Sequence, residues 1–416
     1  MSGADLHPDN LSGQRRQRTP ARLACLTTLL ACLASNAAQA DVNLSGYAKT
    51  FVVGQQAIAN NLFNAAGIWQ AQTNVRLKWD AVQTDNSGPF ALAWQCHYEL
   101  SPGISSRATN NAGSAGLASR ADVPYRFSDP SANLVDQPRY QLGQNLDRLN
   151  VQLQFASGDL TLGRQAMTFG SARIINPTDV FLPFAVGTLN TEYRTGIDGI
   201  RFQRPLGQLG ELDLGLVLGQ DGQRDNSAAF VHVKTNLDGN DLEFTAISFG
   251  QQTLLGAGVQ TSLGTMGFWF EGAVVNGADH YWRVSTGLDY AFNELLLGLV
   301  EYHYNGAGGT DPNDYLGLAA TQAYQRGGVF LLGQHYLIPG LNLQLTPLLT
   351  ISAQAIINLA DTSAFVSVDG SYNLAEDLYL GAGYYHFTGK APTASGLAAE
   401  YGASPDALYM RLSLYF

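Results

Sequence analysis

The sequence has 416 residues and a formal net charge of −11, and only 14% of its residues are charged. The length allows two soluble domains or one large β-barrel. The acidic balance argues against nucleic acid as a partner.

The first forty residues differ from the rest of the chain. Four arginines between residues 15 and 22 precede a short apolar run at residues 23–35, and an Ala-Gln-Ala sequence ends at Ala40. This order is typical of a secretory signal peptide, and the run is too short to span a bilayer. We therefore expect a signal peptide at residues 1–40, cleaved near Ala40, and a single barrel domain at residues 41–416.

Two weaker interpretations of the N-terminus remain open. Leu29-Leu30-Ala31-Cys32 faintly resembles a lipoprotein cleavage site, and Arg15-Arg16 faintly resembles a twin-arginine signal. Cleavage near Ala40 would remove two aspartates and four arginines, which changes the formal charge from −11 to −13. It would also leave Cys96 as the one remaining cysteine, so that no internal disulfide could form.

After residue 40, apolar and polar residues alternate in many short segments. In one of them, Val75, Leu77 and Trp79 alternate with Arg76 and Lys78. A period of two is typical of a strand with one apolar and one polar face, and no apolar run approaches the ~18 residues of a transmembrane helix. The eighteen predicted strands are residues 42–53, 72–83, 88–100, 147–156, 159–169, 197–205, 210–219, 228–236, 240–249, 252–261, 265–275, 281–291, 295–304, 329–345, 348–359, 363–374, 377–387 and 407–416.

The links between these strands alternate in length. Barrels of bacterial outer membranes have short periplasmic turns, long outer loops and an even number of strands, and each clearly long or short link falls on the side that this rule requires. The longest link, residues 101–146, is expected to be a structureless loop, either exposed or folded into the lumen. About ten residues per strand at ~3.3 Å each, tilted by ~40–45°, span roughly 25 Å, the height of the apolar band. Ile338-Pro339-Gly340 interrupts one strand, so sixteen strands remain possible.

The last eleven residues, DALYMRLSLYF, show the alternation most clearly. Leu408, Met410, Leu412 and Leu414 fall on one parity with the terminal Phe416. An apolar parity that ends in an aromatic residue resembles the C-terminal signature of outer-membrane barrels. The fold class that we predict is all-β, a transmembrane antiparallel barrel in the outer membrane of a Gram-negative bacterium. Its expected partners are outer-membrane lipid, lipopolysaccharide and the barrel-assembly machinery, which would bind the last strand.

The stretch TLGRQAMTFGSARIINPTDVFLPF, residues 161–184, breaks the strand pattern. Leu160 and Leu162 are even whereas Met167 and Phe169 are odd, so a bulge at Gly163 would let all four face lipid and would point Arg164 inward. The prolines that follow cannot continue a ladder. Two interpretations of residues 170–196 stay open: a loop folded into the lumen, where its charges select solutes, or an outer loop in water.

Part of this region resembles a known family. Gly163-Arg164-Gln165, Gly170 to Arg173, residues 176–181 and residues 196–201 are similar to outer-membrane porin-like barrels of the alginate-export type. Residues 346–381 resemble the closing hairpins of uncharacterised proteobacterial relatives. The resemblance covers about a quarter of the chain and implies a barrel that exports or admits solutes.

Eighteen strands would enclose water, which predicts a channel for passive or substrate-biased diffusion of small hydrophilic solutes, with anionic solutes as one option. Cations on the inward parity could form a positive ladder, or each could pair with an inward acid. The candidate pore-lining residues are Arg76, Lys78, Arg164, Arg173, Asp179, Arg194, Arg201, Lys234 and Arg283.

Two other functions are alternatives to a channel. One is a structural or adhesive barrel without an open pore. The other is a hydrolase at the outer rim, for which His280 and His386 are placed near the rim but lack a recognisable Ser-His or Asp-His spacing. Nucleotide-binding loops, Cys-x-x-Cys pairs and metal-binding histidine spacings are absent from the sequence, so no enzyme activity, cofactor or metal is expected.

Overall fold

The computed structural model describes residues 40–59, 64–83, 91–108, 123–129, 132–394 and 396–416. The predicted signal peptide lies outside the described residues, apart from Ala40. The barrel strands are β1 (Ala40–Gln55), β4 (Ile68–Gln83), β5 (Ala91–Ser105), β7 (Tyr140–Phe155), β8 (Gly158–Gln165), β9 (Ile197–Leu206), β10 (Gly210–Val217), β11 (Ala228–Leu237), β12 (Asn240–Phe249), β13 (Gln252–Leu263), β14 (Met266–Gly277), β15 (Tyr281–Ala291), β16 (Leu296–Asn305), β17 (His335–Thr346), β18 (Leu349–Asn358), β19 (Ala364–Ala375), β20 (Leu378–Thr388) and β21 (Ala407–Tyr415).

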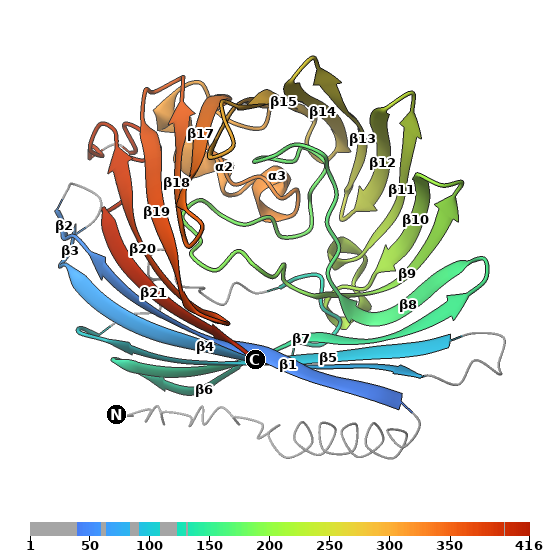
Figure 1. Ribbon diagram of the computed structural model, residues 1–416. Helices are drawn as coiled ribbons and strands as arrows, with labels where there is room; N and C mark the ends of the chain where they lie inside the picture. Colours follow the sequence, from blue (N-terminus) through green and yellow to red (C-terminus); the bar gives the residue numbers. More distant parts are fainter. Residues whose placement is uncertain (1–39, 60–63, 84–90, 109–122, 130–131, 395) are drawn as a thin grey trace, which may run out of the picture.

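These strands form a closed antiparallel barrel (Figure 1). Each pairs with its neighbour along the chain, and the ring closes where β1 pairs with β21 on one edge and with β4 on the other. The prediction of an eighteen-strand barrel is confirmed. The sixteen-strand alternative is wrong, because β17 continues through Pro339 and pairs with both β16 and β18.

Two predicted ranges differ from the structure, and short elements lie at the ends of the barrel strands. Residues 329–334 are predicted as strand, but β17 begins only at His335. The expectation of a structureless 101–146 segment is wrong at both ends, because β5 and β7 reach into it and β6 pairs with β7, whereas the described residues 123–129 form no strand. The short elements are β2 (Ile58–Ala59), β3 (Asn64–Ala65), β6 (Ala132–Gln137), η2 (Gln220–Gly222), η3 (Arg224–Asn226), η4 (Pro312–Asp314), α2 (Tyr315–Leu318) and α3 (Gln322–Gln325).

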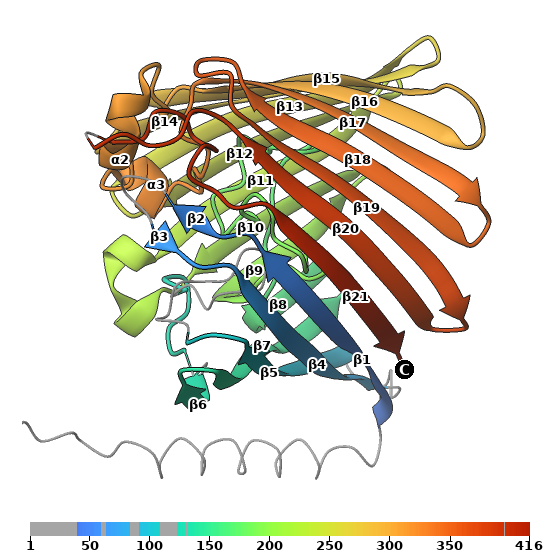
Figure 2. The same ribbon diagram turned by 90° about the vertical axis from the view of Figure 1, so that its left-hand side faces the viewer.

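The strands place alternate side chains outside and inside the barrel, and they run obliquely across it (Figure 2). In β21, the outward Leu408 and Met410 are 51% and 53% exposed, whereas the inward Ala407 and Tyr409 are buried. An apolar outer face suits hydrocarbon, as the alternation in the sequence predicts. Among the described residues, no helix is both long and apolar enough to cross a membrane.

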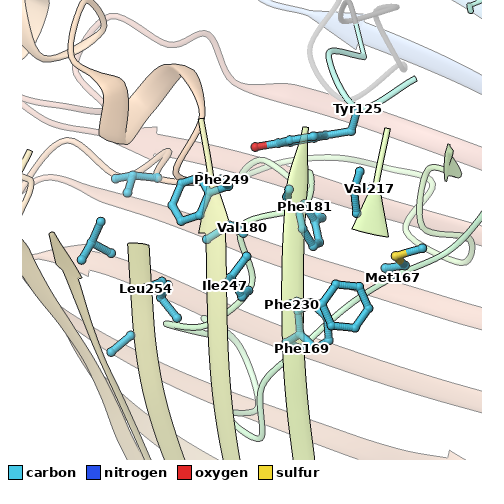
Figure 3. Close-up of a cluster of buried hydrophobic side chains, with 14 of the residues drawn as sticks. Tyr125, Met167, Phe169, Val180, Phe181, Val217, Phe230, Ile247, Phe249 and Leu254 are labelled. Carbon is cyan, nitrogen blue, oxygen red and sulfur yellow. The ribbon is translucent and has the colours of Figure 1, made fainter. Parts of the chain in front are cut away.

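The chain between β8 and β9, residues 166–196, crosses the space inside the ring (Figure 1), and α2 and α3 lie at one end of the barrel (Figure 2). We call residues 166–196 the lumen segment. Its Phe169, Val180 and Phe181 pack against the inward Phe230 of β11 and Ile247 of β12 (Figure 3). Wall side chains alone cannot fill a barrel of this size, so the segment and the wall bury each other.

This packing corrects the prediction for the end of β8. Met167 and Phe169 do not face lipid; they lie beyond the last residue of β8 and are 2% and 4% exposed inside the barrel. The ladder passes Gly163 without a register shift on either side, so the bulge predicted there is wrong. A real bulge lies in β7, where the register slips by one residue and leaves Asp147 unpaired.

Candidate functional site

The first half of the lumen segment is held by Glu271, an inward residue of β14. One oxygen of its carboxylate accepts hydrogen bonds from the backbone N–H groups of Ser171 and Ala172 at 2.7 and 2.9 Å. The other accepts from the Thr178 N–H at 2.8 Å and from its hydroxyl at 2.7 Å. Glu271 is fully buried. A buried carboxylate needs such donors to offset its desolvation.

Glu301 of β16 binds the adjoining turn in the same way. Its Oε2 accepts from the N–H groups of Arg173 and Ile174, both at 3.1 Å, and from the indole N–H of Trp269 at 2.9 Å. Its Oε1 accepts from the Ile175 N–H at 2.9 Å. The two glutamates therefore fix residues 171–178 against the inner wall, mostly through the main chain of the turn and in addition through the Thr178 hydroxyl.

The other end of the lumen segment meets the opposite wall at Asp147, the bulged residue of β7. Its Oδ2 lies 2.8 Å from Arg76 Nη1 and 2.6 Å from Arg148 Nη1, and Arg126 Nη2 is 3.6 Å from Oδ1. Oδ1 also accepts the Gly196 N–H at 2.9 Å. A Cβ on Gly196 would lie 1.9 Å from the Asp147 carbonyl oxygen, so this contact requires glycine.

The structure shows where each predicted pore-lining residue lies, and most of the arginines are paired. Pairing of inward cations with inward acids is the second of the two predicted arrangements, and the described residues of the wall follow it rather than forming an unpaired positive ladder. Arg164 lies at the end of β8, where it also donates to the carbonyl oxygens of Leu146 and Ser128. The shortest acid contacts are Arg76 with Asp147 at 2.8 Å, Arg164 with Asp198 at 2.7 Å, Arg194 with Asp179 at 2.7 Å and Arg201 with Asp213 at 2.6 Å.

Asp179 and Arg194 form an ion pair within the lumen segment itself. Asp179 is fully buried, and burial raises the pKa of its carboxyl to about 6 although Arg194 lowers it. Arg194 also donates to the Leu182 carbonyl oxygen and lies over the Phe184 ring. The pair closes the segment on itself, so it organises the turn whichever solutes pass.

The remaining candidates differ in their access to water. Arg173 is half exposed, with its guanidinium over the Trp269 ring and 3.4 Å from Asp289. Lys234 is exposed on the inward parity of β11, and Lys78 donates to the Tyr193 hydroxyl at 3.2 Å. Arg283 is only 2% exposed and donates to the Gly327 carbonyl oxygen. Arg173 and Lys234 can therefore meet a passing solute directly, whereas Arg283 is covered.

Sequence reasoning missed five residues that position the lumen segment. Glu271 and Glu301 lie on the inward parity of their predicted strands, but nothing in their spacing indicates which main-chain groups they bind. The sequence holds two weak signals for the other three residues. One is an extra residue in the alternation of β7, and the other is a charged residue that has no oppositely charged neighbour in the sequence. The missed residues are Asp147, Glu271, Glu301, and the ion pair Lys49 with Glu192.

The fold brings together two histidine pairs that the sequence spacing did not reveal. His303 Nδ1 lies 2.8 Å from the Ser285 hydroxyl, but that hydroxyl donates to the Ile175 carbonyl oxygen and both side chains are buried beneath the lumen segment. His386 Nδ1 is 2.9 Å from Asp406, which also accepts from the Tyr384 hydroxyl. The first pair is a packing contact and the second braces the loop after β20.

A buried network ties the loops between β16 and β21 together at Glu400. Its carboxylate accepts from the Tyr336 hydroxyl, the Leu332 N–H and the Asn358 amide at 2.5–2.9 Å, and the Glu400 N–H donates to Asp361. Burial raises the pKa of Glu400 from 4.5 to about 7, and the nearby Asp361 adds to the rise. Protonation of Glu400 therefore favours this arrangement of the loops.

The network predicts a pH dependence of stability. Because the folded-state pKa is the higher one, the stabilisation is fully present below pH 4.5 and is lost as the pH rises through about 7, at about 1.4 kcal/mol for each pKa unit. Urea unfolding of the refolded barrel at pH 5 and pH 8 should show this loss. In Glu400→Gln, which is neutral at both values, the difference should shrink. An equal difference in both proteins would contradict the assignment.

A closed barrel with an apolar outer face, whose interior is crossed by its own chain, has the architecture of an outer-membrane channel. The sequence matches the Gram-negative porin family over residues 26–392, and the chain belongs to this family. It is an outer-membrane channel for small solutes in a Gram-negative bacterium. The family is non-enzymatic, which excludes the hydrolase alternative.

Solved structures with the same fold include proteins of two species. OccAB3 of Acinetobacter baumannii is 12% identical with a TM-score of 0.56, and the match covers 90% of this chain and 99% of that one. OccAB4 of the same species is 8% identical with a TM-score of 0.58, and the match covers 92% of this chain and 99% of that one. OpdQ of Pseudomonas aeruginosa is 9% identical with a TM-score of 0.54, and the match covers 90% of this chain and 98% of that one. Identities this low show the fold alone. Comparison with curated proteins finds no match.

Proposed function

We propose that the channel passes small hydrophilic solutes, anionic ones included, by diffusion past the lumen segment. The observation that carries this proposal is the inner wall itself, where ion-paired arginines keep part of their surface open to the lumen. Arg201 and Arg411 are 20% and 24% exposed beside their acid partners. Paired charges with exposed edges can exchange contacts with a moving ion without binding it tightly, which suits a channel better than a trap.

Arg201 provides the test of charge preference. Its guanidinium donates from Nε and Nη2 to Asp213 at 2.6–3.0 Å, so Arg201→Gln would leave an unneutralised acid facing the lumen. We expect the ratio of chloride to potassium permeability, measured from reversal potentials in planar bilayers, to fall about two- to threefold. Arg204→Gln is the matched control, since Arg204 lies exposed on the opposite parity of β9. Equal effects of both variants would contradict a pore-lining role for Arg201.

The finer resemblance to barrels of the alginate-export type would make a uronate polymer the cargo. A polyanion needs a continuous row of free cations, whereas Arg76, Arg164 and Arg201 here are each neutralised by an acid. Small solutes are therefore the proposed cargo. Alginate oligomers that compete with chloride for conduction more strongly than monomeric uronate would favour the polymer instead.

We also propose three features of biogenesis that rest on the sequence. The signal peptide is removed near Ala40, the assembly machinery binds the last strand through Phe416, and the outward apolar belt contacts lipid and lipopolysaccharide. The exposure of Leu412, Leu414 and Phe416 at 45–53% supports the second and third. N-terminal sequencing of the protein from outer membranes tests the first.

A further inference from the structure

The tip of the lumen segment places a carboxylate in contact with a buried lysine. Lys49 of β1 points inward with 6% of its side chain exposed, and it forms an ion pair with Glu192, whose side chain is 33% exposed. The hydroxyl of Tyr415 donates to the same Glu192 oxygen at 2.8 Å. Lys49 Nζ also lies 4.5 Å from the centroid of the Tyr47 ring and 5.2 Å from that of Tyr415.

The two donors and the acid have different origins. Lys49 and Tyr415 lie on adjacent paired strands, since Lys49 pairs with Ser413 and Tyr47 with Tyr415 in the β1–β21 register. Both are therefore fixed by the barrel wall. Glu192 comes from the lumen segment and reaches them only with its side chain. The wall supplies two donors for a carboxylate, the Lys49 ammonium and the Tyr415 hydroxyl, and Glu192 occupies the position between them.

The main chain beside Glu192 is held without its carboxylate. The neighbouring Tyr193 ring stacks on Tyr47 with centroids 5.8 Å apart, and the Arg76 guanidinium lies 4.6 Å from the Tyr193 centroid. Glu192 can therefore leave Lys49 by a rotamer change, and the segment need not move. The rotation itself is fast, because Glu192 is exposed. A solute carboxylate must take its place, since buried Lys49 would otherwise be left without an anion.

A cavity of about 540 Å³ opens directly beside this contact. Its lining combines apolar and aromatic surface, from Phe51, Leu189 and Tyr379, with the hydroxyls of Ser371 and Ser413. Asp377 and Arg411 also line it, and Arg411 is paired with Asp369. A solute whose carboxylate replaced that of Glu192 would have its body in this cavity. The lining fits a body with an apolar face and a polar edge better than a bare ion.

We propose that Lys49 and Tyr415 form a binding site for small organic carboxylates on the path through the channel, and that Glu192 is a tethered competitor which keeps this site weak. The inference rests on the proposed function and adds its solute class and its specificity-determining residue. A tethered carboxylate prevents a passing anion from being trapped, because it re-enters the site at a high effective concentration once the solute moves on. Glu192 thereby lowers the affinity of the site for the solute and shortens the time for which each solute stays bound.

The test is block of potassium chloride current by benzoate in planar bilayers. A competitor present at about ten times its own dissociation constant weakens apparent binding about tenfold, so Glu192→Gln should lower the half-blocking benzoate concentration about tenfold. Asp377→Asn is the matched control, since Asp377 lines the same cavity and the change in charge is identical. Benzamide, which lacks the charge, should block neither protein.

Variants of the wall complete the experiment. In the Glu192→Gln background, Tyr415→Phe should raise the half-blocking concentration again by removing one donor, and Lys49→Gln should abolish block. Equal shifts in Glu192→Gln and Asp377→Asn would overturn the proposal, because they would show that the loss of any negative charge beside the cavity has the same effect. An unchanged half-blocking concentration in Glu192→Gln would also overturn it. Phosphate that blocks as strongly as benzoate would overturn the assignment to organic carboxylates.

Failure of the channel itself gives a different result. If the wild-type barrel carries no current, the proposed function fails. The site is then tested by calorimetric titration of benzoate into the folded protein in detergent, where Glu192→Gln should again bind about tenfold more tightly than wild type. Absence of that difference in the calorimeter would overturn the binding site independently of conduction.

Discussion

Glu271→Gln combined with Glu301→Gln should raise the single-channel conductance roughly twofold or more. Glutamine has one acceptor oxygen and one NH₂ group where glutamate has two acceptors. At Glu271, each oxygen receives two donors, so either orientation of the amide leaves two donors without an acceptor. At Glu301, the better orientation leaves the Ile175 N–H without one. Three buried donors at about 1–3 kcal/mol each cost about 3–9 kcal/mol.

That loss is of the same size as the packing which would remain. Phe169, Val180 and Phe181 each contribute about 1.5–3 kcal/mol by burial, so the hydrophobic contacts alone barely retain the segment. We expect residues 171–178 to detach while the barrel stays closed, since the strand pairing is untouched. Trypsin should then cut after Arg173 faster than in wild type, as a second measure of detachment.

The matched control for this double variant is Glu294→Gln, an acid in the exposed turn between β15 and β16. It should change neither the conductance nor the proteolysis. A double variant with wild-type conductance and wild-type resistance to trypsin would show that the two carboxylates do not hold the lumen segment.

The barrel could be predicted from the sequence because its signal is local. In β21 the outward Leu408 to Leu414 and the inward Tyr409 and Ser413 alternate within one strand, and lipid on one side enforces that alternation along every strand. Short turns such as Asp238-Gly239 are equally local. The number of strands followed from these two features, and Ile338-Pro339-Gly340 misled only because Pro339 was weighed as a strand breaker although β17 continues through it.

The interior could not be predicted because its contacts are remote in sequence. Ser171 and Glu271 are separated by 100 residues, and Lys49 and Glu192 by 143. A carboxylate that will bind main-chain N–H groups looks in the sequence like any inward acid. One usable signal was overlooked: Phe230 and Ile247 are apolar on the inward parity of adjacent strands, and an apolar inner wall indicates that something covers it.

The bulge at Asp147 was missed for a related reason. A single extra residue shifts the parity of β7 between Arg148 and Leu146, and the sequence offered a similar shift after Gly163. Both could be bulges on pattern alone. In the structure, the shift after Gly163 marks the end of β8, because the chain leaves the wall there to enter the lumen.

Asp147→Asn should lower the free energy of unfolding by about 3–5 kcal/mol, since it leaves buried guanidinium groups without their shared anion. Arg126 and Arg148 are buried, and Asp147 is the acid that contacts both of them and Arg76. Urea titration of the folded barrel in detergent, followed by its electrophoretic mobility without heating, measures the change. Asp238→Asn is the control, because Asp238 lies in an exposed turn at φ 52°, a conformation that asparagine adopts readily.

A second substitution separates the effect of the lost charge at Asp147 from the effect of its altered shape. Arg148→Gln added to Asp147→Asn removes one cation together with the anion, and Arg76 and Arg126 keep Glu99 and Asp129 as partners. The double variant should therefore be more stable than Asp147→Asn alone, a coupling that a double-mutant cycle measures directly. Additive losses from the two substitutions would mean that Asp147 acts by filling space at the bulge, and the electrostatic account of this end of the lumen segment would be wrong.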